Sequence, residues 1–371
     1  MKNYKRNNCR LCKSSKLKKA VRFIPTPPAD SYLKSRIEAK KLKIIPLTVM
    51  LCDNCGHSQL SHVINAKQVY LNYIYETAST LGLNNHFKIC ADTVCKKYRP
   101  KKNGLVVDIG SNDGILLHFF KKNGLKVLGI DPMPGISKRA KKYGVNTIEK
   151  FFNKKEAEKI RKKYGYSEVV TSNNLVADTD NLDNFIIGVK KLMNNSSIFF
   201  FETFYFYSQI KNFVWDFTYH EHYSYFTVGP LKKYFEKFGL EIIDLEKNNT
   251  KGGSIRFVLQ LKGGIRKIRP IVNRMIKYEK RASINKLNGL KRYEKKIKES
   301  CEKFKSFLKS RKINEFAGYG ASATSTTLIY NYNLASKIKY LVDDFEAKIN
   351  LFSPGKAIRV LKSKELYLKK P

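Results

Sequence analysis

Few folds can accommodate the stretch Leu105–Asp131, whose sequence is LVVDIGSNDGILLHFFKKNGLKVLGID. Residues 105–109 are a short apolar run rich in β-branched residues, which is typical of a buried parallel strand. Glycines bracket a turn at 110–114, helical apolar spacing follows over 115–122, and residues 127–130 form a second apolar run. The stretch therefore predicts strand, turn, helix and strand in succession, which is one unit of an α/β fold.

The turn in this stretch indicates a cofactor site. A glycine turn at the carboxyl end of a strand lets a ligand approach the backbone beside a helix N-terminus, and an acid ending the next strand can accept both hydroxyls of a ribose. The turn D-I-G-S-N-D-G differs from the dinucleotide fingerprint G-x-G-x-x-G. It resembles motif I of class I S-adenosylmethionine (SAM) methyltransferases, in which the acid helps to hold the cationic methionine end. A generic βαβ unit with a structural turn is the alternative. The candidate cofactor residues are Asp108, Gly110, Ser111, Asn112, Gly114, Asp131 and, after a later strand, Asn173.

Strand and helix patterns continue to alternate after this stretch. Strands are expected at 144–148, 168–172, 197–202, 241–246 and 255–260, and helices at 154–163, 182–193 and 231–238. This alternation predicts a doubly wound parallel sheet.

Two C-x2-C pairs lie near the start of the chain. Cys9 and Cys12 form the first pair, and Cys52 and Cys55 form the second. Four thiolates in two tight turns suit a tetrahedral Zn²⁺ site without an open position, which is a structural site. Four unrelated buried cysteines are the alternative.

Hydropathy and net charge limit the partners that we expect for this protein. No segment is long and apolar enough to span a bilayer, and the start offers no apolar signal-peptide core, so we expect a cytoplasmic protein with no membrane contact. The net charge of +41 raises the question of nucleic acid. Lysines outnumber arginines, however, and are spread along the whole chain, as an AT-biased genome would produce. We therefore do not expect nucleic acid as the partner.

The loop WDFTYHEHYSYFT at 215–227 holds the candidate catalytic groups. Within it, Tyr219, His220, Glu221 and His222 bring a phenol, two imidazoles and a carboxylate together. A histidine beside a carboxylate is a standard arrangement for abstracting a proton. The spacing is not the H-E-x-x-H of a catalytic zinc site. A structural loop rich in Tyr and His is the alternative.

The C-terminal part repeats a nucleotide-binding pattern. The Lys-rich stretch 262–312 has helical spacing, and a strand and the turn Gly318–Ala323 follow, with Asp343 ending a later strand. The pattern is G-x-G-x-x-A, but too little chain follows it for a whole dinucleotide fold, so we expect no NAD site. We expect a zinc-binding domain at 1–66, a methyltransferase domain at 67–262, a helical linker at 263–313 and a smaller Rossmann-like domain at 314–371.

Taken together, these motifs resemble the SAM-dependent sugar C-methyltransferases that act on nucleotide-linked ketosugars. The resemblance covers essentially the whole chain. It rests on the four cysteines, a Tyr-x-Tyr segment (Tyr73, Tyr75), the Asp108–Gly114 turn, Asp131, Asn173-Asn174, the Tyr219–His222 loop, the Gly252–Ser254 turn and Gly318–Ala321.

The resemblance implies methyl transfer to the carbon beside the ketone of a nucleotide-linked 4-keto-deoxyhexose, with dTDP as the expected nucleotide. His222 would be the base and Glu221 would orient it, while Tyr219 and Tyr75 would bind the sugar or the developing oxyanion. Zn²⁺ would be structural, the C-terminal half would help to bind the nucleotide, and the protein would be a monomer or a homodimer.

The chain departs from the family at the sugar side. Asp178 stands where the family pattern Asn-Asn-x-x-Ala-His has histidine, and Lys251 stands where relatives tend to have histidine before the Gly-Gly-Ser turn. Asp178 must then take over any proton transfer made by that histidine, or the role has moved.

Three other functions compete with this interpretation. A zinc-containing nucleic-acid methyltransferase would place Asn/Asp-Pro-Pro-aromatic after the fourth strand, where this chain has Ser172-Asn173-Asn174-Leu175. A non-catalytic relative would bind SAM and a nucleotide sugar without turnover. An NAD-dependent oxidoreductase would use the turn at Gly318.

Overall fold

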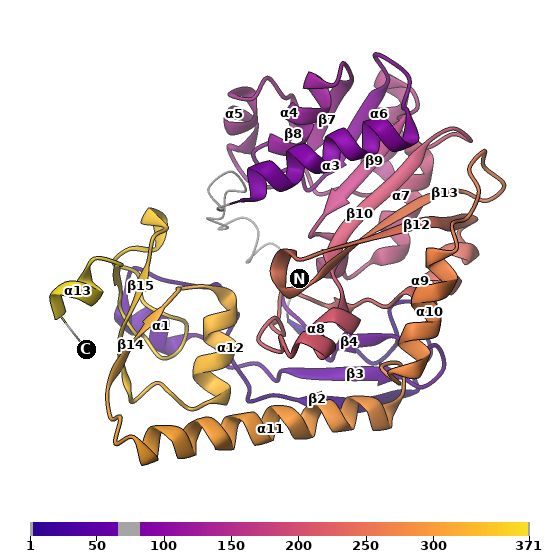
Figure 1. Ribbon diagram of the computed structural model, residues 1–371. Helices are drawn as coiled ribbons and strands as arrows, with labels where there is room; N and C mark the ends of the chain where they lie inside the picture. Colours follow the sequence, from indigo (N-terminus) through magenta and orange to yellow (C-terminus); the bar gives the residue numbers. More distant parts are fainter. Residues whose placement is uncertain (1–2, 66–81, 370–371) are drawn as a thin grey trace.

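A seven-stranded mixed sheet forms the centre of the computed structural model, which describes residues 3–65 and 82–369 (Figure 1). The strand order is β12-β13-β10-β9-β6-β7-β8, with β6 to β10 parallel and β13 antiparallel to both of its neighbours. The strands are β6 (Leu105–Ile109), β7 (Lys126–Ile130), β8 (Thr147–Ile148), β9 (Val169–Asn173), β10 (Ile198–Phe204), β12 (Leu240–Asn248) and β13 (Ser254–Leu261). The predicted α/β fold is confirmed, and β6 has the predicted bounds.

Helices cover both faces of this sheet, which explains why its parallel strands are continuous apolar runs. One face packs Val106 and Phe200 against helices α3, α4 and α5, and the other packs Val107, Phe199 and Phe201 against α6, α7 and α9. The helices are α3 (Leu83–Tyr98), α4 (Ile115–Lys122), α5 (Ile136–Lys141), α6 (Lys154–Tyr164), α7 (Leu182–Leu192), α8 (Phe206–Asn212) and α9 (Val228–Lys237).

A second sheet joins the N-terminal region to the central part of the chain. Its order is β11-β4-β3-β2. Strands β2 (Leu17–Arg22), β3 (Thr48–Cys52) and β4 (Ser58–Leu60) come from the cysteine region, whereas β11 (Ser224–Tyr225) directly follows the Tyr-His-Glu-His loop. Nearby, β1 (Tyr4–Lys5) pairs with β5 (His62–Val63). The expected N-terminal domain therefore shares its sheet with the candidate catalytic loop.

The C-terminal part contains helices α10 to α13 and a small parallel sheet. Helix α11 (Leu287–Ser310) runs along β2 (Figure 1), where Glu294 accepts a hydrogen bond from the Arg22 backbone N–H at 2.9 Å. The other elements are α10 (Ile271–Arg281), α12 (Ala323–Asn331), α13 (Glu365–Lys369), β14 (Phe316–Tyr319), β15 (Ile338–Asp343) and β16 (Val360–Lys362). The N-terminal segment around α1 (Arg36–Lys41) packs here, through a bridge between Leu33 and Phe352.

No helix among the described residues is both long and apolar enough to cross a bilayer.

Candidate active site

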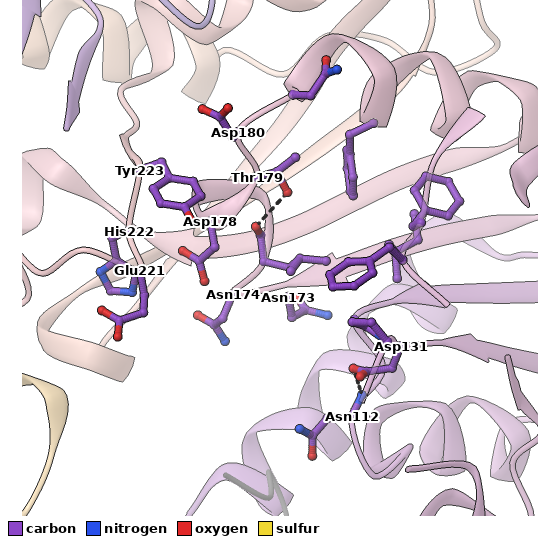
Figure 2. Close-up of a pocket in the computed structure, with 18 of the residues that line it drawn as sticks. Asn112, Asp131, Asn173, Asn174, Asp178, Thr179, Asp180, Glu221, His222 and Tyr223 are labelled. Atoms are coloured by element: carbon purple, nitrogen blue, oxygen red, sulfur yellow. Dashed lines mark hydrogen bonds between the residues drawn. The ribbon is translucent and has the colours of Figure 1, made fainter. Parts of the chain in front are cut away.

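A cavity of about 1010 Å³ lies between the carboxyl end of the central sheet and the N-terminal region. Most of the predicted site residues line it, and Figure 2 shows the Asp131 side and the His222 side facing one space. Those in its wall are Asp108, Gly110, Ser111, Asn112, Asp131, Asn173, Asp178, Tyr219, Glu221 and His222. Tyr75, and Tyr73 beside it, lie outside the described residues.

Backbone contacts fix the turn after β6. Asp131 accepts hydrogen bonds from the backbone N–H groups of Asn112 and Met133, each at 3.0 Å, so its carboxylate is held at the end of β7. Gly110 has φ +76°, and a Cβ atom there would lie 2.8 Å from Cδ2 of Leu175. The turn thus needs glycine for both its conformation and its close approach to the next loop.

The same edge of the sheet offers buried acceptors to a cation. Oδ1 of Asp108 and Oδ1 of Asn173 are buried without a hydrogen-bond partner among the described residues. Burial, together with the nearby carboxylates of Asp131 and Asp113, raises the pKa of Asp108 well above its usual range. A carboxyl group in this position is stabilised by a positive charge, and the ammonium and sulfonium groups of SAM supply one. The residues therefore fit SAM.

His222 is held in one tautomer. Its Nδ1 lies 2.9 Å from the carbonyl oxygen of Phe217, which can only accept, so Nδ1 carries the proton and Nε2 is the acceptor. The ring centroid lies 4.3 Å from that of Phe204 and 4.0 Å from that of Tyr219. Burial lowers the pKa of His222 to about 3, so the ring is neutral at physiological pH. This is the form in which histidine can accept a proton.

The expectation that Glu221 orients His222 is wrong, because the Phe217 carbonyl does so. Oε1 of Glu221 accepts from the backbone N–H of Asp30 at 3.4 Å, and Oε2 is buried without a partner among the residues described. Burial and the Asp30 carboxylate raise the pKa of Glu221 to about 7. The two neighbouring side chains leave the loop toward different surroundings, which sequence adjacency cannot reveal.

Two further charged groups line the cavity from short 3₁₀ turns. Asp178 ends η2 (Val176–Asp178), and Lys251 lies in η3 (Thr250–Gly252). The sequence identified Lys251 only as a departure from the family and did not predict it as a site residue. Its position directly before two glycines was the available signal.

The four cysteines form a compact cluster. Their Sγ atoms all lie within 4.8 Å of one another, with 3.6 Å between Cys9 and Cys55 and 3.4 Å between Cys12 and Cys52. A tetrahedron with Zn–S bonds of about 2.3 Å has edges of about 3.8 Å, so the cluster fits Zn²⁺. Because four thiolates fill the coordination shell, the metal supplies structure and no reaction site.

Comparisons with known proteins agree with this geometry. A zinc-binding domain model matches residues 9–70, a methyltransferase domain model matches 86–245, and a C-methyltransferase C-terminal domain model matches 249–371. C-methyltransferase NovU from Streptomyces niveus is 26% identical over 357 residues, which cover 95% of this chain and 85% of NovU.

Two solved structures are also similar. The PH0226 protein from Pyrococcus horikoshii OT3 has 14% identity and a TM-score of 0.42, covering 53% of this chain and 100% of that chain. Magnesium protoporphyrin IX methyltransferase from Synechocystis PCC 6803, with bound SAH, has 12% identity and a TM-score of 0.39, covering 49% of this chain and 84% of that chain.

Proposed function

Because the chain is a SAM-dependent C-methyltransferase, we propose that it methylates the carbon beside the ketone of a nucleotide-linked sugar. The simplest candidate is a dTDP-linked 4-keto-deoxyhexose. The observation that carries the proposal is the neutral His222, which lines the same cavity as the cofactor edge of the sheet and whose Nε2 can accept a proton. A base in this position suits removal of a proton from carbon.

The cofactor half uses the edge of the central sheet. SAM supplies the electrophilic methyl group. Asp131 accepts the ribose hydroxyls, and Asp108, with Asn173 beside it, faces the cationic methionine end. Gly110 lets the cofactor lie against the backbone of the turn.

The sugar half uses the Tyr-His-Glu-His loop. Nε2 of His222 takes the proton from the carbon next to the ketone, and the electron pair moves to the ketone oxygen to give an enolate. The carbon would then form a bond to the methyl group as the S–CH3 bond of SAM breaks, and the electron pair of that bond would go to sulfur to give SAH. His222 finally returns its proton to solvent, so one proton is released per methyl group transferred.

Other groups of the cavity position the sugar. The unpartnered Oε2 of Glu221 faces a ligand that has hydroxyl groups, because a buried acceptor without a partner costs free energy. Tyr219 packs on His222, with the ring centroids 4.0 Å apart, and we assign its phenol to the same substrate. We assign Tyr75 the matching role from the resemblance alone.

The test is methyl transfer from isotopically labelled SAM to a panel of nucleotide-linked 4-ketohexoses, with RNA and duplex DNA as further substrates. The expected product is a ketosugar heavier by one methyl group. Transfer to nucleic acid, or SAM binding without transfer to any ketosugar, would contradict the proposal.

A further inference from the structure

We propose that the ammonium group of Lys251 binds the enolate oxygen of the substrate and that Asp178 positions this lysine. The inference rests on the proposed function and deepens it, because it names the group that stabilises the negative charge created by His222. Lys251, Asp178 and His222 all line the same cavity.

The first argument is the backbone of Lys251. It has φ 51° and ψ 38°, a left-handed conformation that costs free energy in any residue with a Cβ atom. The next two positions, Gly252 and Gly253, also have positive φ, and a Cβ atom there would lie 2.7 Å from Val214 and 2.5 Å from Ser208. Glycine is therefore used where this turn requires it, yet a lysine occupies the remaining left-handed position. Strain retained at a cavity wall indicates a use for the side chain.

The second argument is the rigidity of this turn. The Gly252 carbonyl accepts from Nδ2 of Asn212 at 3.1 Å, and the Gly253 carbonyl accepts from the Tyr205 backbone N–H at 3.0 Å. The Gly253 N–H in turn donates to the Thr250 carbonyl at 2.9 Å. The long side chain of Lys251 thus begins from a fixed point, which reduces the entropy lost when its ammonium group meets an anion.

The third argument is charge. Across the described ranges no hydrogen bond or ion pair holds the Lys251 ammonium. The carboxylates that act on it are those of Asp178 and Glu202, and Glu202 is already bound to His86 at 2.8 Å and to Arg256 at 2.9 Å. Asp178 lines the same cavity as Lys251, and we assign its carboxylate as the counter-charge that positions the lysine, whose ammonium group has donors to offer a ligand.

The position of Lys251 in the cavity also affects His222. The positive charge of Lys251 helps to lower the pKa of His222, which keeps the base neutral. When His222 takes the carbon-bound proton, the electron pair moves to the ketone oxygen, and a nearby ammonium group stabilises the charge that develops there. The pair then returns to carbon as the new carbon–carbon bond forms and the sulfur leaves with its own pair.

The decisive variant is Lys251→Gly, because glycine accepts the left-handed backbone and the protein should fold with unchanged or higher thermal stability. Two reactions are measured: deuterium uptake at the carbon beside the ketone in D2O with SAH bound, and methyl transfer with SAM. We expect both rates to fall about 10²–10³-fold, as for loss of one oxyanion donor. SAM affinity should not change, and added butylammonium should restore part of the rate.

Lys251→Arg keeps the charge and should retain more activity than Lys251→Met, while Asp178→Asn should have an intermediate effect. If the wild-type protein methylates the ketosugar and Lys251→Gly stays within about threefold of it, Lys251 does not bind the enolate and the inference is overturned. If the wild-type protein neither exchanges nor methylates any ketosugar, the proposed function fails, and this inference fails with it.

Discussion

At the scale of single residues, His222 and Glu221 are neighbours with opposite electrostatic environments. Burial lowers the pKa of the histidine to about 3 and raises that of the glutamate to about 7. Opposite shifts in one cavity separate a proton acceptor from a carboxyl group that is partly protonated near neutral pH. The pair therefore divides its tasks, with His222 acting on the substrate carbon and Glu221 on a hydroxyl group.

Replacing the base should separate chemistry from cofactor binding. We expect His222→Gln to lower methyl transfer about 10²–10⁴-fold, because no other neutral imidazole lines the cavity among the described residues. SAM affinity, measured by calorimetry, should remain that of the wild type. His118→Gln on α4 is the matched control and should keep full turnover. Wild-type turnover in His222→Gln would remove the base assignment.

The pH dependence follows from the direction of the His222 shift. A base works when it is unprotonated, so a lowered pKa extends its working range toward acid pH. We expect kcat/KM to show no fall centred near pH 6.5 and to persist to about pH 5. The groups whose charge bears on this titration are Lys251 and its counter-charges Asp178 and Glu202. Glu221, with a pKa of about 7, also lines this cavity, so the profile is compared with that of Glu221→Gln. An acid limb near 6.5 that persists in Glu221→Gln would mean that His222 titrates as an exposed histidine.

Spacing in the sequence could predict some of these residues but not others. The C-x2-C pairs and the distance from the Asp108 turn to Asp131 are local patterns, so the four cysteines and the carboxylate could be identified directly. The role of Phe217 could not be predicted, because it acts through its backbone carbonyl, a group that every residue has. The importance of Lys251 depends on its positive φ and on the charges of Asp178 and Glu202, which are distant in the sequence, and no local pattern encodes either.

At the scale of elements, β6, its turn and α4 have the bounds predicted from apolar periodicity. The strand β11 was not predicted, because two residues are too few to show alternation. Its pairing with β4 is a contact between residues far apart in the sequence. Apolar periodicity therefore predicted the strands and the helix at the cofactor edge well. It did not predict the pairing of β11 with β4 that supports the catalytic loop.

The turn after β6 can be tested with two glycines. Gly110 and Gly124 have φ of +76° and +80°, so alanine at either costs about 1–2 kcal/mol in backbone strain. Only at Gly110 would the new Cβ overlap a neighbour, Leu175, while nothing lies within 4 Å at Gly124. We expect Gly110→Ala to lower SAM affinity at least about tenfold, since overpacking adds about 1–3 kcal/mol. Gly124→Ala should lower only Tm, and equal SAM affinity in the two variants would contradict this account.

At the scale of the whole molecule, both the N-terminal and the C-terminal part of the chain hold the Tyr-His-Glu-His loop. Strand β11 pairs with β4 of the cysteine region, and Arg10, fully buried, donates to the carbonyl of Tyr223 at 3.1 Å. From the C-terminal part, Thr327 donates to the carbonyl of Thr218 at 3.0 Å. The central sheet presents the cofactor residues, whereas the outer parts position the loop opposite them.

This division predicts how the enzyme responds to loss of zinc. Cys52 ends β3, which pairs with β4, and Arg10 directly follows Cys9, so releasing the metal loosens both supports of the loop. The cofactor edge lies on the separate central sheet. We therefore expect chelation, or Cys12→Ser, to lower kcat for methyl transfer at least about tenfold while SAM affinity changes little.

The control for that experiment is Cys95→Ser on α3, which removes a cysteine outside the cluster and should leave zinc content and kcat unchanged. Metal content is measured together with turnover and SAM binding, and zinc is added back to test reversal. Full turnover in metal-free protein would show that the loop keeps its position without the cluster. Parallel loss of SAM binding would show that the metal supports the central sheet as well. Loss of kcat alone, restored by zinc, is the result expected if zinc acts through β3, β4 and β11 on the position of His222.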